Sequence, residues 1–239
     1  MHRSGTSLIA RIAALAGADF GDPDSFQPPD RWNTDGYFEQ KEILAVNMAL
    51  VNGPFWKFSY FRLPSREVIL RRARRHRDNL RELSAKYRQL FVKENRFCLT
   101  LPAWLSYGAE IPHVLVVFRE PREVAKSLKA RNRIPYSLSY RLWCRHYQSL
   151  LKETESIPRT FVWYNRVIDA EDGEAETQIV LRALGLPSEG AAELVGRTVR
   201  YSKKAEPPGA DTYPAAVEDL YRQLQESRQE GIKELSSVR

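Results

Sequence analysis

Short runs of β-branched and apolar residues alternate along this chain with longer segments of helical periodicity, and this alternation limits the folds open to it. The predicted strands lie at 90–92, 114–118 and 160–163. The predicted helices span 4–16, 37–50, 65–90, 122–130, 137–153, 176–184 and about 213–232. Strands separated by helices favour an α/β fold with a mainly parallel sheet, because parallel neighbours need a crossover connection.

Length and composition agree with one folded domain over residues 1–239. Hydrophobic residues make up 43% of the chain and charged residues 28%, a balance that excludes a disordered protein. Two cysteines are too few for a disulfide-rich secreted module. No apolar run approaches the ~20 residues that a membrane span needs. We therefore expect a cytoplasmic protein without a membrane span.

The positive charge is unevenly distributed. The formal net charge is +7, and two segments, 66–88 and 119–145, carry the whole excess. In the first segment the apolar residues recur at helical spacing, so the arginines are predicted to occupy the opposite, solvated face. A basic helix of this length is compatible with a polyanion-binding or nucleic-acid-binding module, although it contains no recognised nucleic-acid motif.

The most specific local pattern is the pentapeptide at 3–7, which opens the first predicted helix. It consists of Arg3, Ser4, Gly5, Thr6 and Ser7. A glycine flanked by hydroxyl residues at a helix start lets backbone N–H groups surround an anion, and the helix dipole and the arginine add positive potential. The pattern predicts a phosphate or sulfate site. It lacks the G-x-x-x-x-G-K-[ST] sequence, which disfavours a nucleoside triphosphatase.

A second pattern follows the predicted strand 114–118. Arg119 stands at the carboxyl end of this strand, where parallel sheets bind ligands, and Pro121 suits the first turn of a helix. Ser127 then lies about two turns into that helix. An arginine and a hydroxyl in these positions can share a second phosphate.

Together the two patterns resemble the signature regions of sulfotransferases that use 3′-phosphoadenosine 5′-phosphosulfate (PAPS). The resemblance implies that residues 3–7 bind the 5′-phosphosulfate, and that Arg119 and Ser127 bind the 3′-phosphate. It also implies a P-loop-like three-layer domain, with helices on both faces of a sheet of roughly four or five strands. The resemblance covers roughly residues 2–200.

Three further segments support the resemblance. Residues 36–39 (Gly-Tyr-Phe-Glu) resemble the G-Y-[FW]-E segment of bacterial and carbohydrate-type members. Residues 93–96 (Lys-Glu-Asn-Arg) look like their K-D-P-R segment with asparagine in place of proline. Tyr164 falls where the family has a tyrosine that contacts the adenine.

The implied reaction is transfer of a sulfuryl group from PAPS to an acceptor hydroxyl, which belongs to a carbohydrate or another metabolite. The second product is 3′,5′-ADP. Such a reaction requires positive charge at the leaving phosphate and a base for the acceptor proton. Arg3 suits the first role. Glu39 is the candidate base, since related carbohydrate and tyrosine sulfotransferases use a glutamate; Glu42 is a weaker candidate, and a histidine stays open. Neither a metal nor a metal-ligand cluster is expected.

The sequence departs from the family at its beginning. In the family a central strand precedes the first signature region, whereas only two residues precede Arg3 here. We expect that this strand belongs to a longer natural chain or is replaced by another segment, because its absence would leave neighbouring strands unpaired. A P-loop-type kinase is the alternative enzyme, disfavoured by the missing Lys-Ser/Thr sequence.

Overall fold

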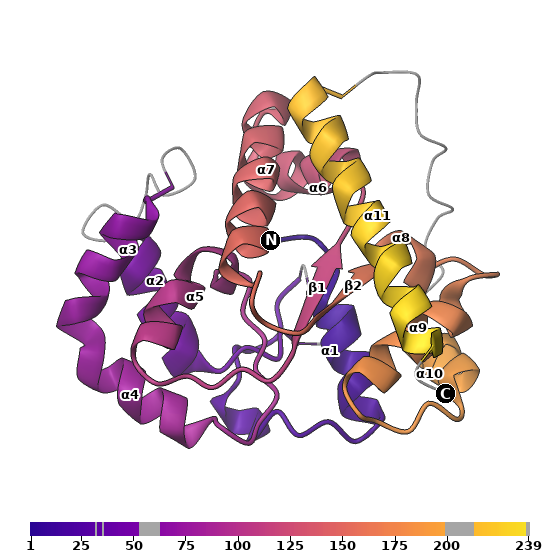
Figure 1. Ribbon diagram of the computed structural model, residues 1–239, viewed down its shortest axis with the longest axis horizontal. Coiled ribbons are helices and arrows are strands. Elements are labelled where there is room, and N and C mark those ends of the chain that lie inside the picture. The colour runs from indigo at the N-terminus through magenta and orange to yellow at the C-terminus, as the bar shows by residue number, and fades with distance from the viewer. Residues whose placement is uncertain (32, 35, 53–62, 199–212, 238–239) are drawn as a thin grey trace. The chain divides into compact units, whose positions relative to one another are not determined.

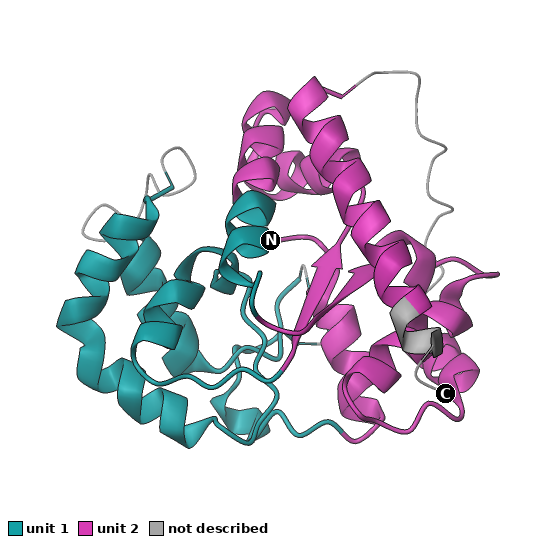
Figure 2. Ribbon diagram, viewed as in Figure 1, with its two compact units in different colours: residues 1, 18–112, 146–156 teal, residues 2–17, 113–145, 157–239 magenta. Residues whose placement is uncertain are grey.

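In a computed structural model the chain is a mixed α/β protein, mostly helical, with one two-stranded parallel sheet. The structure describes all residues except 32, 35, 53–62, 199–212 and 238–239. Two compact units divide the chain, one formed by residues 1, 18–112 and 146–156 and the other by 2–17, 113–145 and 157–239 (Figure 2). We call them unit 1 and unit 2. The expectation of a single domain stays a prediction.

The sheet belongs to unit 2 and consists of β1 (Val114–Phe118) and β2 (Arg159–Trp163), both of which were predicted (Figure 1). The strands are parallel and in register from Val114 opposite Arg159 to Phe118 opposite Trp163. The prediction of four or five strands is wrong for the described residues, in which no strand precedes Arg3 and no other segment joins β1 and β2. A further strand from a longer chain stays a prediction.

Residues 90–92 were predicted as a strand and are not one. The backbone N–H of Phe91 donates to Asp19 O at 2.8 Å, and Phe91 O accepts from the side chain of Gln40 at 3.5 Å. These contacts hold Phe91 in place without a neighbouring strand. Leu90 and Val92 are partly buried against the core of unit 1, but the predicted strand is not formed.

Both faces of the two-stranded sheet are covered by helices of unit 2. Val117 and Val162 pack on one face with Ile9 and Ile12 of α1 (Thr6–Leu15). On the other face the Trp163 ring stacks on Phe118 and lies edge-on to Tyr221 of α11 (Ala215–Ser237). Alternate residues of each strand thus face two different helical layers, as a strand's two-residue period requires.

The remaining helices of unit 2 include three that match predicted helices with shifted ends and two short ones, at 164–167 and 191–198, that were not predicted. They are α6 (Pro121–Asn132), α8 (Tyr164–Val167), α9 (Gly173–Ala183), α10 (Ala191–Thr198) and α11 (Ala215–Ser237), while α7 (Tyr136–Glu153) has residues in both units. The start of α6 is fixed as expected by Pro121 in the first turn, and the Glu120 side chain accepts from Glu123 N at 2.8 Å. The start of this helix fixes the position of Arg119.

Unit 1 is helical in its described part and has a core of its own. Its elements are η1 (Pro23–Ser25), α2 (Lys41–Asn52), α3 (Arg66–Ala73), η3 (Arg74–His76), α4 (Arg77–Lys86) and α5 (Phe97–Ser106). The predicted continuous helix 65–90 is therefore divided by the 3₁₀ turn η3. Ile69 and Leu80, on either side of this turn, are both buried in the same core.

Two features of unit 1 explain the other differences. The predicted helix at 37–50 begins only at Lys41, because Phe38 has a left-handed φ of 53° that a helix does not allow. Helix α5 has no counterpart among the predicted helices, since residues 98–104 are buried all round and show no amphipathic period. In the part of the chain that the structure describes, no helix is long and apolar enough to cross a lipid bilayer.

Candidate functional site

The pentapeptide at 3–7 forms a bent segment at the start of α1. Gly5 is the residue before the helix and has φ of 87°, and Leu8 N donates to its carbonyl at 3.0 Å. Arg3 also has a left-handed φ, 66°, which is uncommon for a residue with a side chain and marks local strain. Ser4 is fully buried between them. Thr6 and Ser7 fill the first helical turn.

The second pattern lies directly beside the first. Arg3 Nε donates to Ser127 Oγ at 2.7 Å, although the two residues are separated by 124 positions in sequence. Arg119 follows β1, and its Nη1 donates to the carbonyl oxygen of Arg3 at 3.5 Å. The residues predicted to bind the 5′ group and those predicted to bind the 3′ group are therefore contiguous within unit 2.

Tyr164 completes this cluster from the end of β2. Its ring lies against Gly5 so closely that a Cβ built on Gly5 would come within 1.8 Å of Tyr164 Cδ2. The guanidinium carbon of Arg119 lies 4.8 Å from the centre of the same ring, a cation–π distance. Five residues predicted to bind the cofactor meet in one place: Arg3, Gly5, Arg119, Ser127 and Tyr164. We call them the anion cluster.

Sequence reasoning missed the residues that hold Arg119. Glu123 Oε2 accepts from Arg119 Nε at 2.7 Å and from Asn165 Nδ2 at 3.0 Å, while Asn165 Oδ1 accepts from Glu120 N at 3.0 Å. The four residues tie the end of β1 to the end of β2. Glu120 is partly buried, and this burial raises the pKa of its carboxyl. The spacing of four between Arg119 and Glu123 was the available signal.

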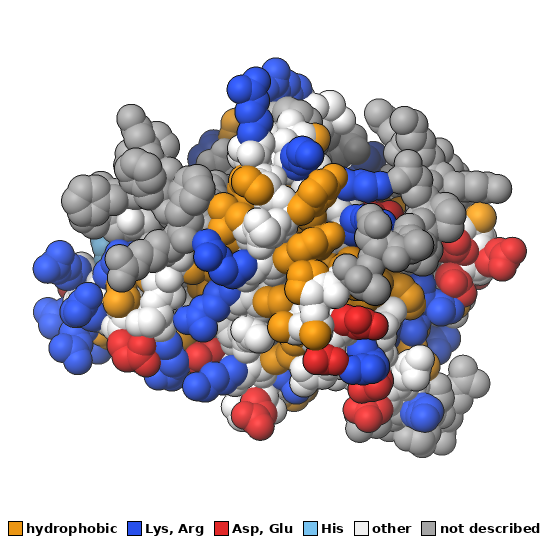
Figure 3. Space-filling model, turned by 90° about the horizontal axis from the view of Figure 1, so that it is seen from above, with side chains coloured by type: hydrophobic (Ala, Val, Ile, Leu, Met, Phe, Trp, Pro, Cys, Tyr) orange, Lys and Arg blue, Asp and Glu red, His pale blue; other side chains and the backbone are white. Residues whose placement is uncertain are grey.

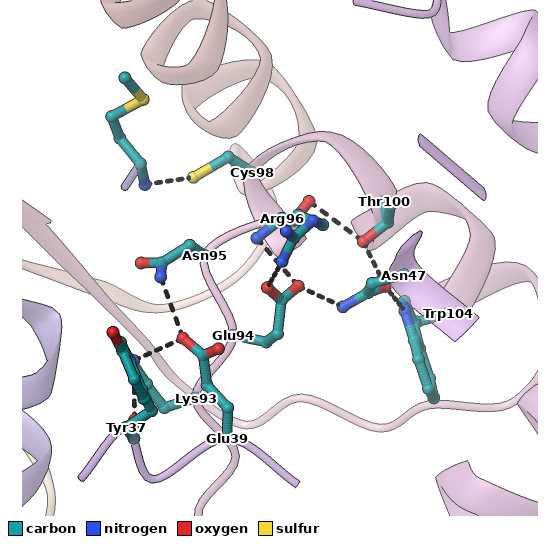
Figure 4. A network of polar contacts seen from close by, with 11 residues as sticks. Tyr37, Glu39, Asn47, Lys93, Glu94, Asn95, Arg96, Cys98, Thr100 and Trp104 are labelled. Atoms are coloured by element: carbon teal, nitrogen blue, oxygen red, sulfur yellow. Dashed lines mark hydrogen bonds and ion pairs between the residues drawn. The ribbon is translucent and has the colours of Figure 1, made fainter. Parts of the chain in front are cut away.

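Glu39, the predicted base, lies in unit 1 and is almost completely buried. Lys93 Nζ donates to Glu39 Oε1 at 2.6 Å and to Tyr37 O at 2.8 Å, and Asn95 Nδ2 donates to the same Glu39 oxygen at 3.0 Å (Figure 4). The side chains of Glu39 and Lys93 are 7% and 11% exposed. Glu39 precedes α2 and is enclosed by the residues around it.

Glu42, the weaker candidate base, is an exposed partner of a surface ion pair. Lys86 Nζ donates to Glu42 Oε2 at 2.6 Å, and this hydrogen bond lowers the pKa of the Glu42 carboxyl. Both side chains are about half exposed. Glu42 is thus a partner in a surface ion pair, whereas the Glu39 side chain is enclosed.

The arginines of α3, η3 and α4 are mostly exposed, as predicted. Exposed arginines in the middle of this stretch are Arg71, Arg74, Arg75, Arg77 and Arg81. Figure 3 shows basic side chains gathered at its left, the side on which Figure 1 draws α3 and α4. Arg72 differs, because its guanidinium donates to the carbonyl oxygens of Leu50 and Val51, both at 2.7 Å. It therefore serves the fold of unit 1.

Among the described residues, no group of three or more His, Cys, Asp or Glu side chains is arranged to hold a metal ion. Comparison of the chain with protein-family models gives no match, and comparison with curated proteins and with solved structures gives none either. The anion cluster and the surroundings of Glu39 are therefore the features that point to a function.

Proposed function

We propose that this protein binds 3′-phosphoadenosine 5′-phosphosulfate and transfers its sulfuryl group to an acceptor hydroxyl of a carbohydrate or other metabolite. The anion cluster is the observation that supports this most strongly. Two guanidinium groups, a hydroxyl, the start of a helix and an aromatic ring meet within unit 2, from three segments distant in sequence. This combination of groups suits a nucleotide that carries phosphates at both the 3′ and the 5′ position of its ribose.

The residues of the cluster suit the two anionic ends of such a nucleotide. Ser127 and Arg119 would hold the 3′-phosphate, and the N-terminal turn of α1 would face the 5′ group with its N–H donors and dipole. Arg3, which reaches Ser127, would place its charge between them and offset the negative charge that grows on the leaving phosphate. Tyr164 would offer its ring to the adenine.

The bound nucleotide would supply the activated sulfuryl group, so the protein must position the acceptor and remove its proton. Glu39 is the proposed base. Both described donors bind its Oε1, and Oε2 is therefore the oxygen that we expect to take the proton. After the sulfuryl group has been transferred, the nucleotide that remains is 3′,5′-ADP.

The proposal includes a P-loop-like three-layer architecture, which the helices on both faces of β1 and β2 support. A P-loop-type kinase remains the alternative enzyme. A polyanion-binding module based on residues 66–88 is the alternative outside enzymes, supported by the exposed arginines of α3 and α4.

Calorimetric titration with 3′,5′-ADP and with 5′-ADP tests the nucleotide assignment. The two ligands differ chiefly in where the second phosphate sits, so selective binding of 3′,5′-ADP is expected. Arg119→Ala should weaken it by about 10- to 100-fold, the effect of losing a charged hydrogen bond. Arg145→Ala removes the same charge from an exposed position of unit 2 and should change little. Equal binding of the two nucleotides would refute the proposal.

Glu39→Gln tests the base separately. The amide keeps the shape of the side chain but does not accept a proton at neutral pH. Turnover of the nucleotide should fall by about 100-fold or more, the scale of general base catalysis, while 3′,5′-ADP binding persists. Substantial remaining turnover would exclude Glu39 from this role.

A further inference from the structure

The segment 93–96 of unit 1 directs alternate side chains in two directions. Lys93 and Asn95 donate to Glu39 Oε1, whereas Glu94 and Arg96 form an ion pair with each other on the other side (Figure 4). The position of the two donors at Glu39 therefore depends on what holds the backbone between them.

Glu94 is the most deeply buried carboxylate of this segment. Its side chain is 0% exposed, and burial raises the pKa of its carboxyl. Arg96 Nη1 donates to Oε1 at 2.6 Å, while Arg96 N at 2.9 Å and Asn47 Nδ2 at 2.7 Å donate to Oε2. A buried carboxylate is tolerated only where such donors compensate for its lost hydration. Moving Glu94 would therefore carry a large free-energy cost.

Asn47 links this carboxylate to the rest of unit 1. It is fully buried on α2, and its Oδ1 accepts from Thr100 Oγ1 at 2.7 Å and from Trp104 Nε1 at 2.8 Å, both on α5. Since two donors face Oδ1, the amide nitrogen must face Glu94. Asn47 thus fixes the segment relative to α2 and α5 with a defined hydrogen-bond direction.

We infer that Glu94 and Asn47 are positioning residues, which hold segment 93–96 so that Lys93 and Asn95 meet the Glu39 carboxylate. The inference rests on the proposed function only for what Glu39 does in the reaction. Neither residue is required to touch substrate. Their effect reaches Glu39 through the backbone of the segment and through the two donors.

This role is tested by exchanging the carboxylate at position 94 with the amide at position 47. Glu94→Gln alone removes the charge that Arg96 faces, and Asn47→Asp alone places a second carboxylate against Glu94. In the double variant the amide nitrogen of residue 94 donates to the carboxylate of residue 47, which still accepts from Thr100 and Trp104. The carbonyl oxygen of residue 94 still accepts from Arg96 Nη1, and only the bond from Arg96 N is lost. The net charge is unchanged, so the double variant should restore most of what each single change removes.

The first readout is the NMR signal of the Lys93 ammonium group in protein labelled with ¹⁵N-lysine. The signal is assigned by its absence from the spectrum of Lys93→Arg. An ammonium held in a buried ion pair exchanges its protons slowly enough to be observed at neutral pH, whereas a released one does not. We expect the signal in the wild type, its loss in both single variants and its return in the double variant. Absence from the wild type, or persistence in both single variants, would overturn the inference.

Folding and activity complete the test. If the single variants do not fold, the double variant must fold and show the Lys93 signal, and its failure would also overturn the inference. Turnover of the nucleotide should fall by about 10- to 100-fold in the single variants, the effect expected of misplacing a reacting group by about 1 Å, with unchanged 3′,5′-ADP affinity and recovery in the double variant. Lack of 3′,5′-ADP binding in the wild type would refute the proposed function while leaving the Lys93 result valid.

Discussion

Replacing Gly5 by alanine tests whether the start of α1 and the end of β2 are built for close contact. Gly5 needs its left-handed φ of 87°, and it has the Tyr164 ring where a side chain would lie. An alanine at position 5 therefore destabilises the folded protein in two ways: its backbone is strained, and its Cβ clashes with the ring.

The structure provides a magnitude for each cost. A left-handed conformation is about 1–2 kcal/mol less favourable for a residue with a Cβ than for glycine. A Cβ 1.8 Å from Tyr164 Cδ2 requires the ring to move, and such overpacking typically costs about 1–3 kcal/mol. Gly5→Ala should thus lower the free energy of unfolding by about 2–5 kcal/mol.

Gly17 provides a matched control. It follows the same helix with φ of 102°, and a Cβ built there meets nothing within 4 Å. Gly17→Ala should therefore show the backbone cost of about 1–2 kcal/mol alone. Adding Tyr164→Ala to Gly5→Ala should recover the difference, because the ring is then absent.

The assay is urea unfolding followed by tryptophan fluorescence for the wild type, Gly5→Ala, Gly17→Ala, Tyr164→Ala and the double variant with both Gly5→Ala and Tyr164→Ala. The free energies form a cycle in which the coupling between positions 5 and 164 equals the cost of the clash. If Gly5→Ala costs no more than Gly17→Ala, or if Tyr164→Ala recovers nothing, the contact between the two segments is not as described.

Three other changes test the surroundings of the anion cluster and the core of unit 2. Asn165→Asp places a carboxylate against Glu123, so Arg119 should be displaced and the affinity for 3′,5′-ADP should fall by about 10-fold. Calorimetric titration measures this affinity. An unchanged affinity would show that Asn165 does not support Arg119. Burial lowers the pKa of His113, so the unfolded chain binds its proton more readily and stability falls as the pH drops below the ordinary value near 6.5. His113→Gln should reduce this loss between pH 7.5 and 5.5 in urea titrations, and an identical pH dependence would contradict the assignment. Arg228→Met leaves the buried Glu176 carboxylate without its main partner and should lower the free energy of unfolding by about 3–5 kcal/mol. Adding Glu176→Gln to Arg228→Met should recover part of this loss. Equal stability of the single and the double variant would show that Arg228 and Glu176 are not energetically coupled.

Local patterns in the sequence predicted the elements whose signals are themselves local. Pro121 and the apolar run before it are sufficient to define β1, Arg119 and the start of α6. Ser65 likewise caps α3, and its side chain accepts from Val68 N, as a serine before a helix commonly does. These features depend on interactions within a few residues, which a sequence displays directly.

Other features depend on partners that the sequence does not place. Residues 90–92 are as apolar as a strand, yet their hydrogen bonds go to Asp19 and Gln40 rather than to a neighbouring strand. Because Phe38 has a left-handed φ, α2 begins several residues later than predicted. Residues 98–104 are all buried, so their sequence lacks the amphipathic period by which α5 could have been predicted. In each case tertiary contacts decided between conformations that local propensity left open.

The candidate sites divide in the same way. The sequence by itself determined which groups could bind an anionic nucleotide, because arginine, glycine and hydroxyl residues at a helix start have that chemistry wherever they occur. Only the tertiary structure decided that Arg3 reaches Ser127, that Tyr164 requires glycine at position 5, and that Lys93 and Asn95 converge on Glu39. Such contacts join residues more than fifty positions apart, and their geometry is set by the packing of the elements that carry them.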